Sequence, residues 1–393
     1  MRSRPASDRP PLLRELAGGV GDWGLLIPIS IALVALNGLD ATIVFAGVGV
    51  TYVATALAFR VPVPVQPLKA FAAGAIALGL SAETLAAGAL LMAVVMVVLA
   101  ITGLAGWLAA RFPVVLVRGI QAAVALLLGK AAVELALDGN WAGMPAIDPA
   151  LSAGLAAVAC LVLLVAARGR VPASLIVLGA GVAIGVAVAG VPDIGFGPQA
   201  PTLALPDSAA FGVALTSLVI TQIPLTFGNS IVATVDAERE YFGASAGRVT
   251  PRRLAASIAG ANTFAGLFGG LPVCHGAGGV TAHHKLGART WRATALAGGI
   301  LIATSLAFGA SLPDLMRLIP PGALAGMLMF VAIQHGLLAA QLDSWPDRAV
   351  AASVGAITLL TGNLAVGFAA GIVLLALRAV VARASGSAPL ARA

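Results

Sequence analysis

The chain has 393 residues, of which 60% are hydrophobic and 10% are charged, and its mean hydropathy is +1.01. Soluble domains carry about 25% charged residues, so this composition excludes a soluble globular protein, a disordered chain and a nucleic-acid-binding protein. The net charge is +7, but the basic residues are too few and too dispersed for a nucleic-acid interface. Two cysteines, Cys160 and Cys274, exclude a disulfide framework. The composition predicts an all-α membrane protein that spans the bilayer many times.

Residues 1–16 open with basic residues and contain no cleavable signal, so we expect a cytoplasmic tail. A spanning helix needs about 20 mostly apolar residues. Division of the chain at charged residues, prolines and glycines predicts fourteen such segments. In chain order they are 20–38, 41–59, 62–80, 84–109, 113–137, 150–167, 171–190, 210–235, 251–269, 271–287, 292–310, 320–340, 347–361 and 363–382.

The distribution of positive charge gives an orientation for these segments. With the N-terminus in the cytoplasm, every Lys and Arg falls on the cytoplasmic side except Lys130 and Arg317 outside and Lys69 within the third segment. This is the bias that the positive-inside rule describes. We therefore expect a multi-pass protein of the cell inner (plasma) membrane, surrounded by lipid, with both termini in the cytoplasm.

The fourteen segments divide into two sets of seven. Because seven is an odd number, a second copy of a seven-segment unit would cross the membrane in the opposite orientation to the first. We expect one repeat over 17–190, an extracytoplasmic linker over 191–207, a second repeat over 208–382 and a cytoplasmic tail over 383–393. Weak self-similarity supports this division, because Pro64-Val-Gln-Pro67 aligns with Pro272-Val-Cys-His275 near the start of the third and tenth segments.

The third and tenth segments are not expected to be continuous helices. Pro62, Pro64 and Pro67 forbid a helix through the start of the third segment, and Gly270, Pro272 and Gly276 interrupt the tenth. Each is predicted to be an extended half followed by a half-helix, and the inversion makes the two half-helix N-termini meet at the midplane. Helix N-termini present free N–H groups and partial positive charge, which predicts an anion site. The alternative is that these prolines and glycines kink ordinary helices.

The residues of these segments also resemble a known family. Gly270-Leu-Pro-Val-Cys-His-Gly-Ala-Gly-Gly-Val280 resembles a signature of the molybdate transporter family of plants and bacteria, and Val61-Pro-Val-Pro-Val-Gln-Pro-Leu-Lys69 resembles another. Residues 15–24 and 224–231 are similar to motifs of its first and eighth segments. A departure is His283-His284, where the family more usually has Gln-Tyr.

That family is related to sulfate permeases and nucleobase transporters. The resemblance implies a fold of two inverted seven-segment repeats, with a core domain from segments 1–4 and 8–11 and a gate domain from segments 5–7 and 12–14. It also implies a possible homodimer.

Eleven residues of the third, eighth and tenth segments are the candidates for substrate binding. They are Gln66, Pro67, Lys69, Gln222, Thr226, Cys274, His275, Gly276, Ala277, Gly278 and Gly279. For Lys69 the alternative is a side chain that snorkels or pairs with a carboxylate. Gln66 either caps the half-helix or donates to substrate, and His275 either contacts substrate or packs against backbone.

No cofactor, resident metal or enzymatic activity is predicted. Cys274, His275, His283 and His284 match no tetrahedral metal-site spacing, and no clustered catalytic set is present.

The predicted function is import of a tetrahedral oxyanion by secondary active transport with alternating access, and the family resemblance implies that this oxyanion is molybdate. Bringing two negative charges into a cell at about −100 mV costs about 4.6 kcal/mol, so we expect proton symport, with Asp22 and His275 as candidate proton carriers. The alternatives are a sulfate transporter, a nucleobase-type symporter and an anion channel.

Overall fold

The computed structural model describes residues 10–104, 107, 113–138, 147–166, 173–198 and 206–384. Helices make up most of these residues, and the only sheet within them consists of two short strands. The elements of the first half are α1 (Leu12–Gly19), α2 (Trp23–Asn37), α3 (Ala41–Phe59), β1 (Gln66–Pro67), α4 (Lys69–Leu78), α5 (Ala82–Thr102), α7 (Val114–Asp138), α8 (Pro149–Ala166) and α9 (Ala173–Ala189).

The second half begins with a long helical segment made of several pieces. The elements are α10 (Ser208–Ala214), α11 (Ile220–Leu225), α12 (Ala233–Phe242), α13 (Pro251–Phe268), β2 (Val273–Cys274), α14 (Ala277–Leu286), α15 (Arg292–Phe308), α16 (Leu312–Arg317), α17 (Pro321–Ala339), α18 (Trp345–Thr361) and α19 (Leu364–Ala384). Short π-helical turns over Leu215–Val219 and Thr226–Val232 join α10, α11 and α12.

Among the described residues, seven helices are long and apolar enough to cross a membrane, or eight if the bent pair α1 and α2 is one span. The remaining predicted segments correspond to the half-helices α4 and α14, to α8 and α9, and to α13 and α18. Segments 84–109, 150–167 and 171–190, both predicted tails and the linker 191–207 extend into residues outside the described ranges.

The first segment differs from the continuous helix predicted over 20–38. The helix starts earlier, at Leu12, and α1 and α2 meet at a bend of 49°. Glycines explain the path of α1, because an ideal Cβ on Gly18 or Gly19 would lie 2.0 Å from the Ala288 amide nitrogen or 2.1 Å from the Ala293 carbonyl oxygen. Part of the region expected to be a tail is therefore a helix packed against α14 and α15.

The eighth segment is longer than predicted. Helical structure continues beyond residue 235 to Phe242, and Pro224 lies between the two π-helical turns. Proline has no backbone N–H and disturbs the regular hydrogen-bond ladder, and π-helical turns absorb such irregularities. One consequence is that Glu238, which lies beyond the predicted segment, is fully buried.

The packing of the helices follows the expected repeat. Helix α3, the second segment, packs mainly on α15, the eleventh. Its counterpart α13, the ninth, packs mainly on α5, the fourth. In the same way α8 packs on α17 and α18 on α7, so the contacts of one repeat recur in the other with the partners exchanged. The fold is therefore one of two inverted seven-segment repeats.

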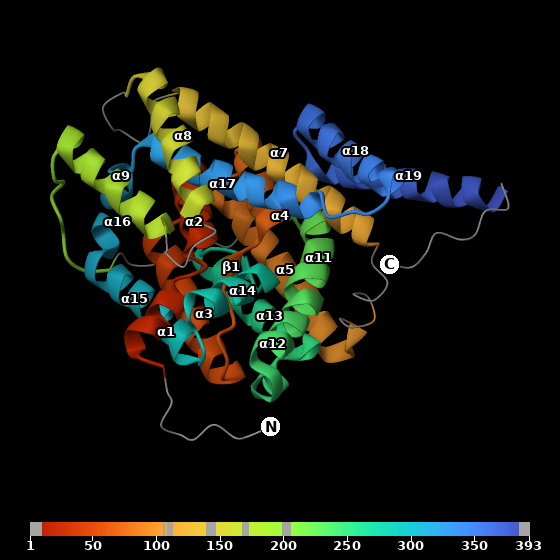
Figure 1. Cartoon of the computed structure of the whole chain (residues 1–393), viewed down its shortest axis with the longest axis horizontal. Coiled ribbons are helices and arrows are strands. Elements are labelled where there is room, and N and C mark those ends of the chain that lie inside the picture. The colour runs from red at the N-terminus through yellow and green to blue at the C-terminus, as the bar shows by residue number, and fades with distance from the viewer. Residues whose placement is uncertain are drawn as a thin grey trace.

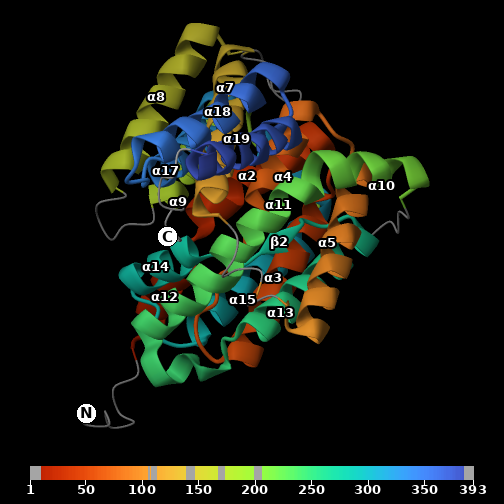
Figure 2. The ribbon, with the colours of Figure 1, turned by 90° about the vertical axis from the view of Figure 1, so that its right-hand side faces the viewer.

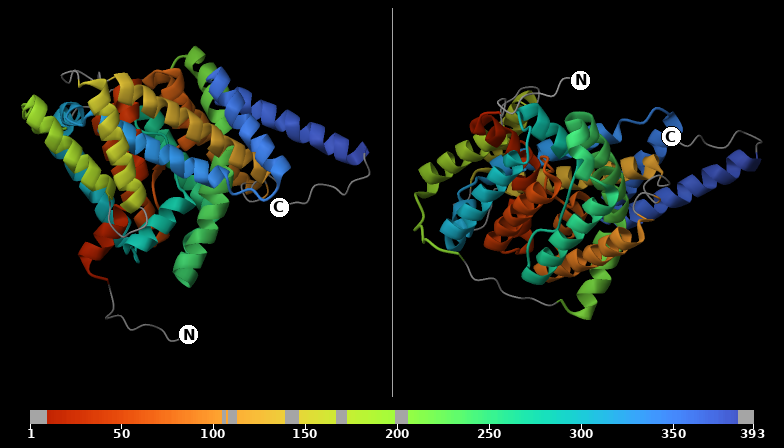
Figure 3. Two further views of the ribbon diagram at one scale, coloured as in Figure 1. Left: turned by 45° about the horizontal axis from the view of Figure 1, so that its top comes forward. Right: turned by 90° about the horizontal axis from the view of Figure 1, so that it is seen from below.

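The helices fall into two groups that lie side by side. Figure 1 and Figure 2 show α7, α8, α17, α18 and α19 together on one side and α1, α3, α12, α13, α14 and α15 on the other, with α2 and α4 between them. The first group holds segments assigned to the expected gate domain and the second holds segments assigned to the expected core domain, and this functional division stays a prediction. Helix α19 extends away from the other helices (Figure 3), and only 22% of its most apolar 18-residue stretch is buried. Apolar side chains exposed in this way identify a multi-pass membrane protein.

Candidate functional site

The two repeats meet at a pair of short strands in the interior. Strand β1 runs antiparallel to β2, with Gln66 opposite Cys274 and Pro67 opposite Val273. The Leu68 amide extends the pairing by donating to the Pro272 carbonyl oxygen at 3.0 Å. Because the strands are antiparallel, the helices that follow them leave in opposite directions, and their N-termini lie close together. The structure thus confirms an extended half and a half-helix in both interrupted segments.

The two half-helices match in length and in the way they end. Helices α4 and α14 each contain ten residues, a length of about 15 Å and so about half of a bilayer core. Each ends at a glycine in the left-handed region, Gly79 with a φ of 58° and Gly287 with a φ of 117°. Glycine adopts this conformation without steric cost, which stops each half-helix at the same place in both repeats.

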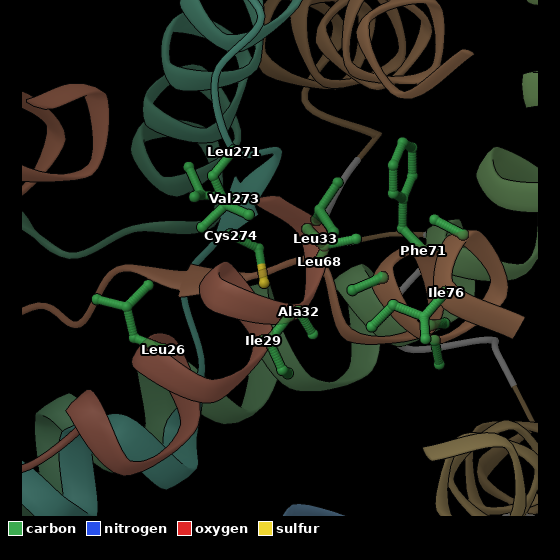
Figure 4. Packing of buried hydrophobic residues seen from close by; sticks show 14 of the residues in the cluster. Leu26, Ile29, Ala32, Leu33, Leu68, Phe71, Ile76, Leu271, Val273 and Cys274 are labelled. Carbon is green, nitrogen blue, oxygen red and sulfur yellow. The ribbon is translucent and has the colours of Figure 1, made fainter. Parts of the chain in front are cut away.

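Side chains from neighbouring segments hold the strand pair in place. Both backbone groups of Val273 bond to the Asn262 side chain, the carbonyl oxygen to Nδ2 at 2.6 Å and the amide to Oδ1 at 3.2 Å. The thiol of Cys274 is directed at the Pro67 carbonyl oxygen, with an S–O distance of 3.6 Å. Figure 4 shows Val273 and Cys274 packed beside Ile29, Ala32 and Leu33 of α2.

His275 connects the two extended segments. Its Nδ1 lies 2.7 Å from the Pro64 carbonyl oxygen, and its Nε2 lies 3.1 Å from Ser257 Oγ. The side chain is 1% exposed, and Phe59 packs edge-on against the ring. Both ring nitrogens are therefore engaged by the protein itself, which is the arrangement expected of a structural His.

A continuous polar chain joins the first and third segments beside the strand pair. The Gln66 Nε2 donates to Asp22 Oδ1 at 2.7 Å, and the Gln66 Oε1 accepts a hydrogen bond from Lys69 Nζ. All three side chains are buried. Gln66 thus does not cap α4 but connects a buried carboxyl group to a buried ammonium group, and this uses one of the two N–H donors of its Nε2. The second carboxyl oxygen, Asp22 Oδ2, has no hydrogen-bond partner within the described ranges.

Glycines of the tenth segment allow its backbone to approach this chain. An ideal Cβ on Gly276 would lie 2.2 Å from Gln66 Oε1 and 3.0 Å from Asn229 Nδ2. One on Gly279 would lie 2.7 Å from Gln66 Nε2 and 2.8 Å from Asp22 Oδ2. Any side chain at these positions would displace the polar chain, so the glycines are required by close approach.

The N-termini of the two half-helices differ in how their backbone amides are capped. In α14 the N-cap is Gly276, so Ala277 and Gly278 begin the helix without a side-chain cap, and Gly278 is exposed. In α4 the Phe71 amide donates to Gln222 Oε1 at 3.1 Å, and Gln222 Nε2 donates to Thr226 Oγ1 at 3.0 Å. Of the predicted residues, Gln222 and Thr226 therefore support α4, whereas Ala277 and Gly278 offer open backbone amides.

The sequence analysis did not select two buried residues near this site, Tyr52 and Glu238, and named His283 only as a departure from the family signature. His283 is fully buried and stacks on Tyr52, whereas the partly buried His284 stacks on Tyr241 of α12. Tyr52 is one of only two tyrosines in the chain and lies in a helix without charged residues, which is the one signal that marks it in the sequence.

Two solved structures of anion transporters superpose on this chain over most of its length. The transmembrane domain of the cyanobacterial bicarbonate transporter BicA superposes with a TM-score of 0.69 at 17% identity, covering 92% of this chain and 97% of that one. Murine Slc26a9 in its inward-facing state superposes with a TM-score of 0.66 at 16% identity, covering 96% and 70%. These similarities establish the fold of two inverted seven-segment repeats.

Sequence comparison gives closer relatives. Molybdate transporter 2 of Arabidopsis thaliana is 26% identical, covering 93% of this chain and 87% of the relative, and its molybdate transporter 1 is 27% identical, covering 91% and 86%. Molybdate transporter 1 of Chlamydomonas reinhardtii is 32% identical over 52% of this chain and 40% of the relative. Residues 14–128 and 214–334 match the profile of the family described as "Molybdate transporter of MFS superfamily". This match covers more than half of the chain and both interrupted segments, so the chain belongs to the molybdate transporter family.

Proposed function

We propose that the chain is a secondary active transporter that imports a tetrahedral oxyanion, molybdate before sulfate, together with protons. The observation that carries this proposal is the buried chain Asp22–Gln66–Lys69 next to the uncapped N-terminus of α14. Backbone amides and a helix dipole favour an anion, and Lys69 adds a buried positive charge. Family membership supports molybdate as the substrate.

The same polar chain supplies a reason for proton coupling. With Asp22 ionised, its charge cancels that of Lys69, and the site presents only backbone dipoles to a dianion. Protonation of Asp22 leaves the positive charge of Lys69 uncompensated, so a dianion binds more tightly. By linkage, the bound dianion also favours protonation of Asp22. His275, the other candidate from the sequence, has both ring nitrogens bonded to protein, so Asp22 is our candidate carrier.

Alternating access is proposed to result from movement of the core group against the gate group. In this cycle we propose that the protein lies in the cell inner membrane with both of its termini on the cytoplasmic side.

Uptake of molybdate into liposomes containing the purified protein tests the proposal. With the voltage clamped, an inward proton gradient is expected to drive accumulation. Asp22→Asn imitates the protonated carboxyl group and is expected to keep molybdate exchange while losing the response to the gradient. Uptake that ignores the gradient in the unmodified protein would disprove proton symport. Displacement of bound molybdate by equimolar sulfate, measured by calorimetry, would instead identify a general sulfate carrier.

A further inference from the structure

Several polar atoms that lie between Asp22 and the far end of α14 are buried without partners. They are Asp22 Oδ2 and both ring nitrogens of His283, and none of these atoms has a hydrogen-bond partner in the described part of the chain. Tyr52 and His283 are fully buried. A buried polar atom without a partner is unfavourable for folding, so such groups close together indicate a role that requires them.

The three groups form a connected series. Gly279 and His283 are four residues apart, so they share one face of α14. An ideal Cβ on Gly279 would lie 2.8 Å from Asp22 Oδ2, which places the carboxyl group over this face about one turn from His283. The His283 ring stacks on Tyr52 with 6.3 Å between ring centroids, and the Tyr52 hydroxyl is close enough to Asp22 for an electrostatic interaction.

Other charged and titratable groups lie on the helices packed around His283. From α1, Arg14 lies against Gly287, and Glu15 accepts from the amides of Arg289 and Thr290. From α12, Tyr241 stacks on His284, and the buried Glu238 lies one turn before Tyr241. On α14 itself, His284 is partly buried and Lys285 is exposed. Within the described residues, none of these groups forms a hydrogen bond with His283.

We propose that Tyr52 and His283 are the proton route between Asp22 and the cytoplasmic side, an inference that rests on the proposed proton coupling. The Asp22 carboxyl group gives its proton to the Tyr52 hydroxyl or to a bridging water. In the same step the Tyr52 hydroxyl, or the water, passes a proton to a ring nitrogen of His283. Overall, the O–H bond of Asp22 breaks and an N–H bond forms at His283. The imidazolium then releases the proton toward the exposed end of α14, where Lys285 lies. In this cycle the three groups return to their starting protonation states, and one proton enters for each release.

The experiment compares two transport modes in liposomes at clamped voltage. Exchange of internal for external molybdate needs no net proton movement, whereas gradient-driven uptake does. Tyr52→Phe and His283→Gln are expected to keep exchange and to lose gradient-driven uptake by about tenfold or more, because positioned proton-transfer groups contribute about 10²–10⁴-fold. His284→Gln, the adjacent substitution on the same helix, is the matched control and is expected to change neither mode.

The outcomes separate this inference from the proposed function. If the unmodified protein ignores the gradient, proton symport fails and the route with it. If the unmodified protein responds and both variants respond equally well, only the route is wrong. Equal loss of both modes in His283→Gln would show a structural role for that residue. Tyr52→Phe removes only a hydroxyl group near the Val65 backbone, and equal loss of both modes in this variant would likewise show a structural role.

Discussion

The two half-helices begin at the same strand pair, but their first turns are built for different tasks. The first turn of α4 is completely buried, carries Lys69 and receives a side-chain cap from Gln222. The first turn of α14 contains Ala277, Gly278 and Gly279, has no side-chain cap and is partly exposed. One half-helix therefore contributes a fixed charge and the other contributes open amides. Under the proposed function, the two copies of one structural unit divide the recognition of an anion between them.

The largest expected effect comes from removing the charge of the α4 side. Lys69→Ala deletes the buried cation and leaves Asp22 without a partner charge, so molybdate affinity is expected to fall by about 100-fold, or about 2.7 kcal/mol. Calorimetry on the purified protein measures this change. Lys130→Ala is the control, since Lys130 is exposed and pairs with Glu134 on its own helix. Affinity within about threefold of the unmodified protein would show that α4 contributes no charge to binding.

Substitutions at two adjacent glycines test the part of the proposed site that α14 contributes. An added Cβ at Gly279 meets Pro64, Gln66 and Asp22 at less than 3.0 Å, whereas one at Gly278 meets no protein atom within 4 Å. Such overpacking costs about 1–3 kcal/mol, so Gly279→Ala is expected to reduce molybdate uptake about tenfold. Gly278→Ala is the matched comparison, and its thermal stability is expected to stay unchanged. Equal uptake by Gly279→Ala and the unmodified protein would contradict the close approach of the two segments.

A smaller effect is expected when the cap of α4 is removed. Gln222→Leu takes away the acceptor of the Phe71 amide and the donor to Thr226, which costs about 1–3 kcal/mol of folding stability. A lower melting temperature with molybdate affinity changed by less than about threefold would confirm that Gln222 supports the helix. The opposite pattern, normal melting with lost affinity, would place Gln222 in contact with the anion.

The smallest effect on transport is expected at His275. His275→Gln weakens the hydrogen bonds to Pro64 and Ser257 and is expected to lower the melting temperature by a few degrees. The response of uptake to a proton gradient is expected to remain, because the ring is already occupied by protein partners. A selective loss of that response would instead make His275 a proton carrier.

The sequence was sufficient for the general arrangement of the fold. Prolines and glycines in two segments predicted the extended halves, since their backbone chemistry excludes a helix wherever the fold places them. The partners of Gln66 were out of reach, because they depend on how the first segment packs across the third. The burial of Glu238 was missed for a similar reason. Its helix ends seven residues beyond the predicted segment, and the packing of α12 on α14, which covers this part of the helix, is not visible in the sequence.

The strand pair also has a consequence for how the protein is assembled. Gln66 enters the membrane early in synthesis, but its partner Cys274 is made about two hundred residues later. Until then, the extended backbone of the third segment and the ammonium group of Lys69 lie at a depth where lipid satisfies neither. Until the second repeat is made, the insertion machinery or the helices of the first repeat must therefore keep these polar groups out of contact with lipid. A chain stopped before residue 273 is expected to be recognised as incomplete and degraded.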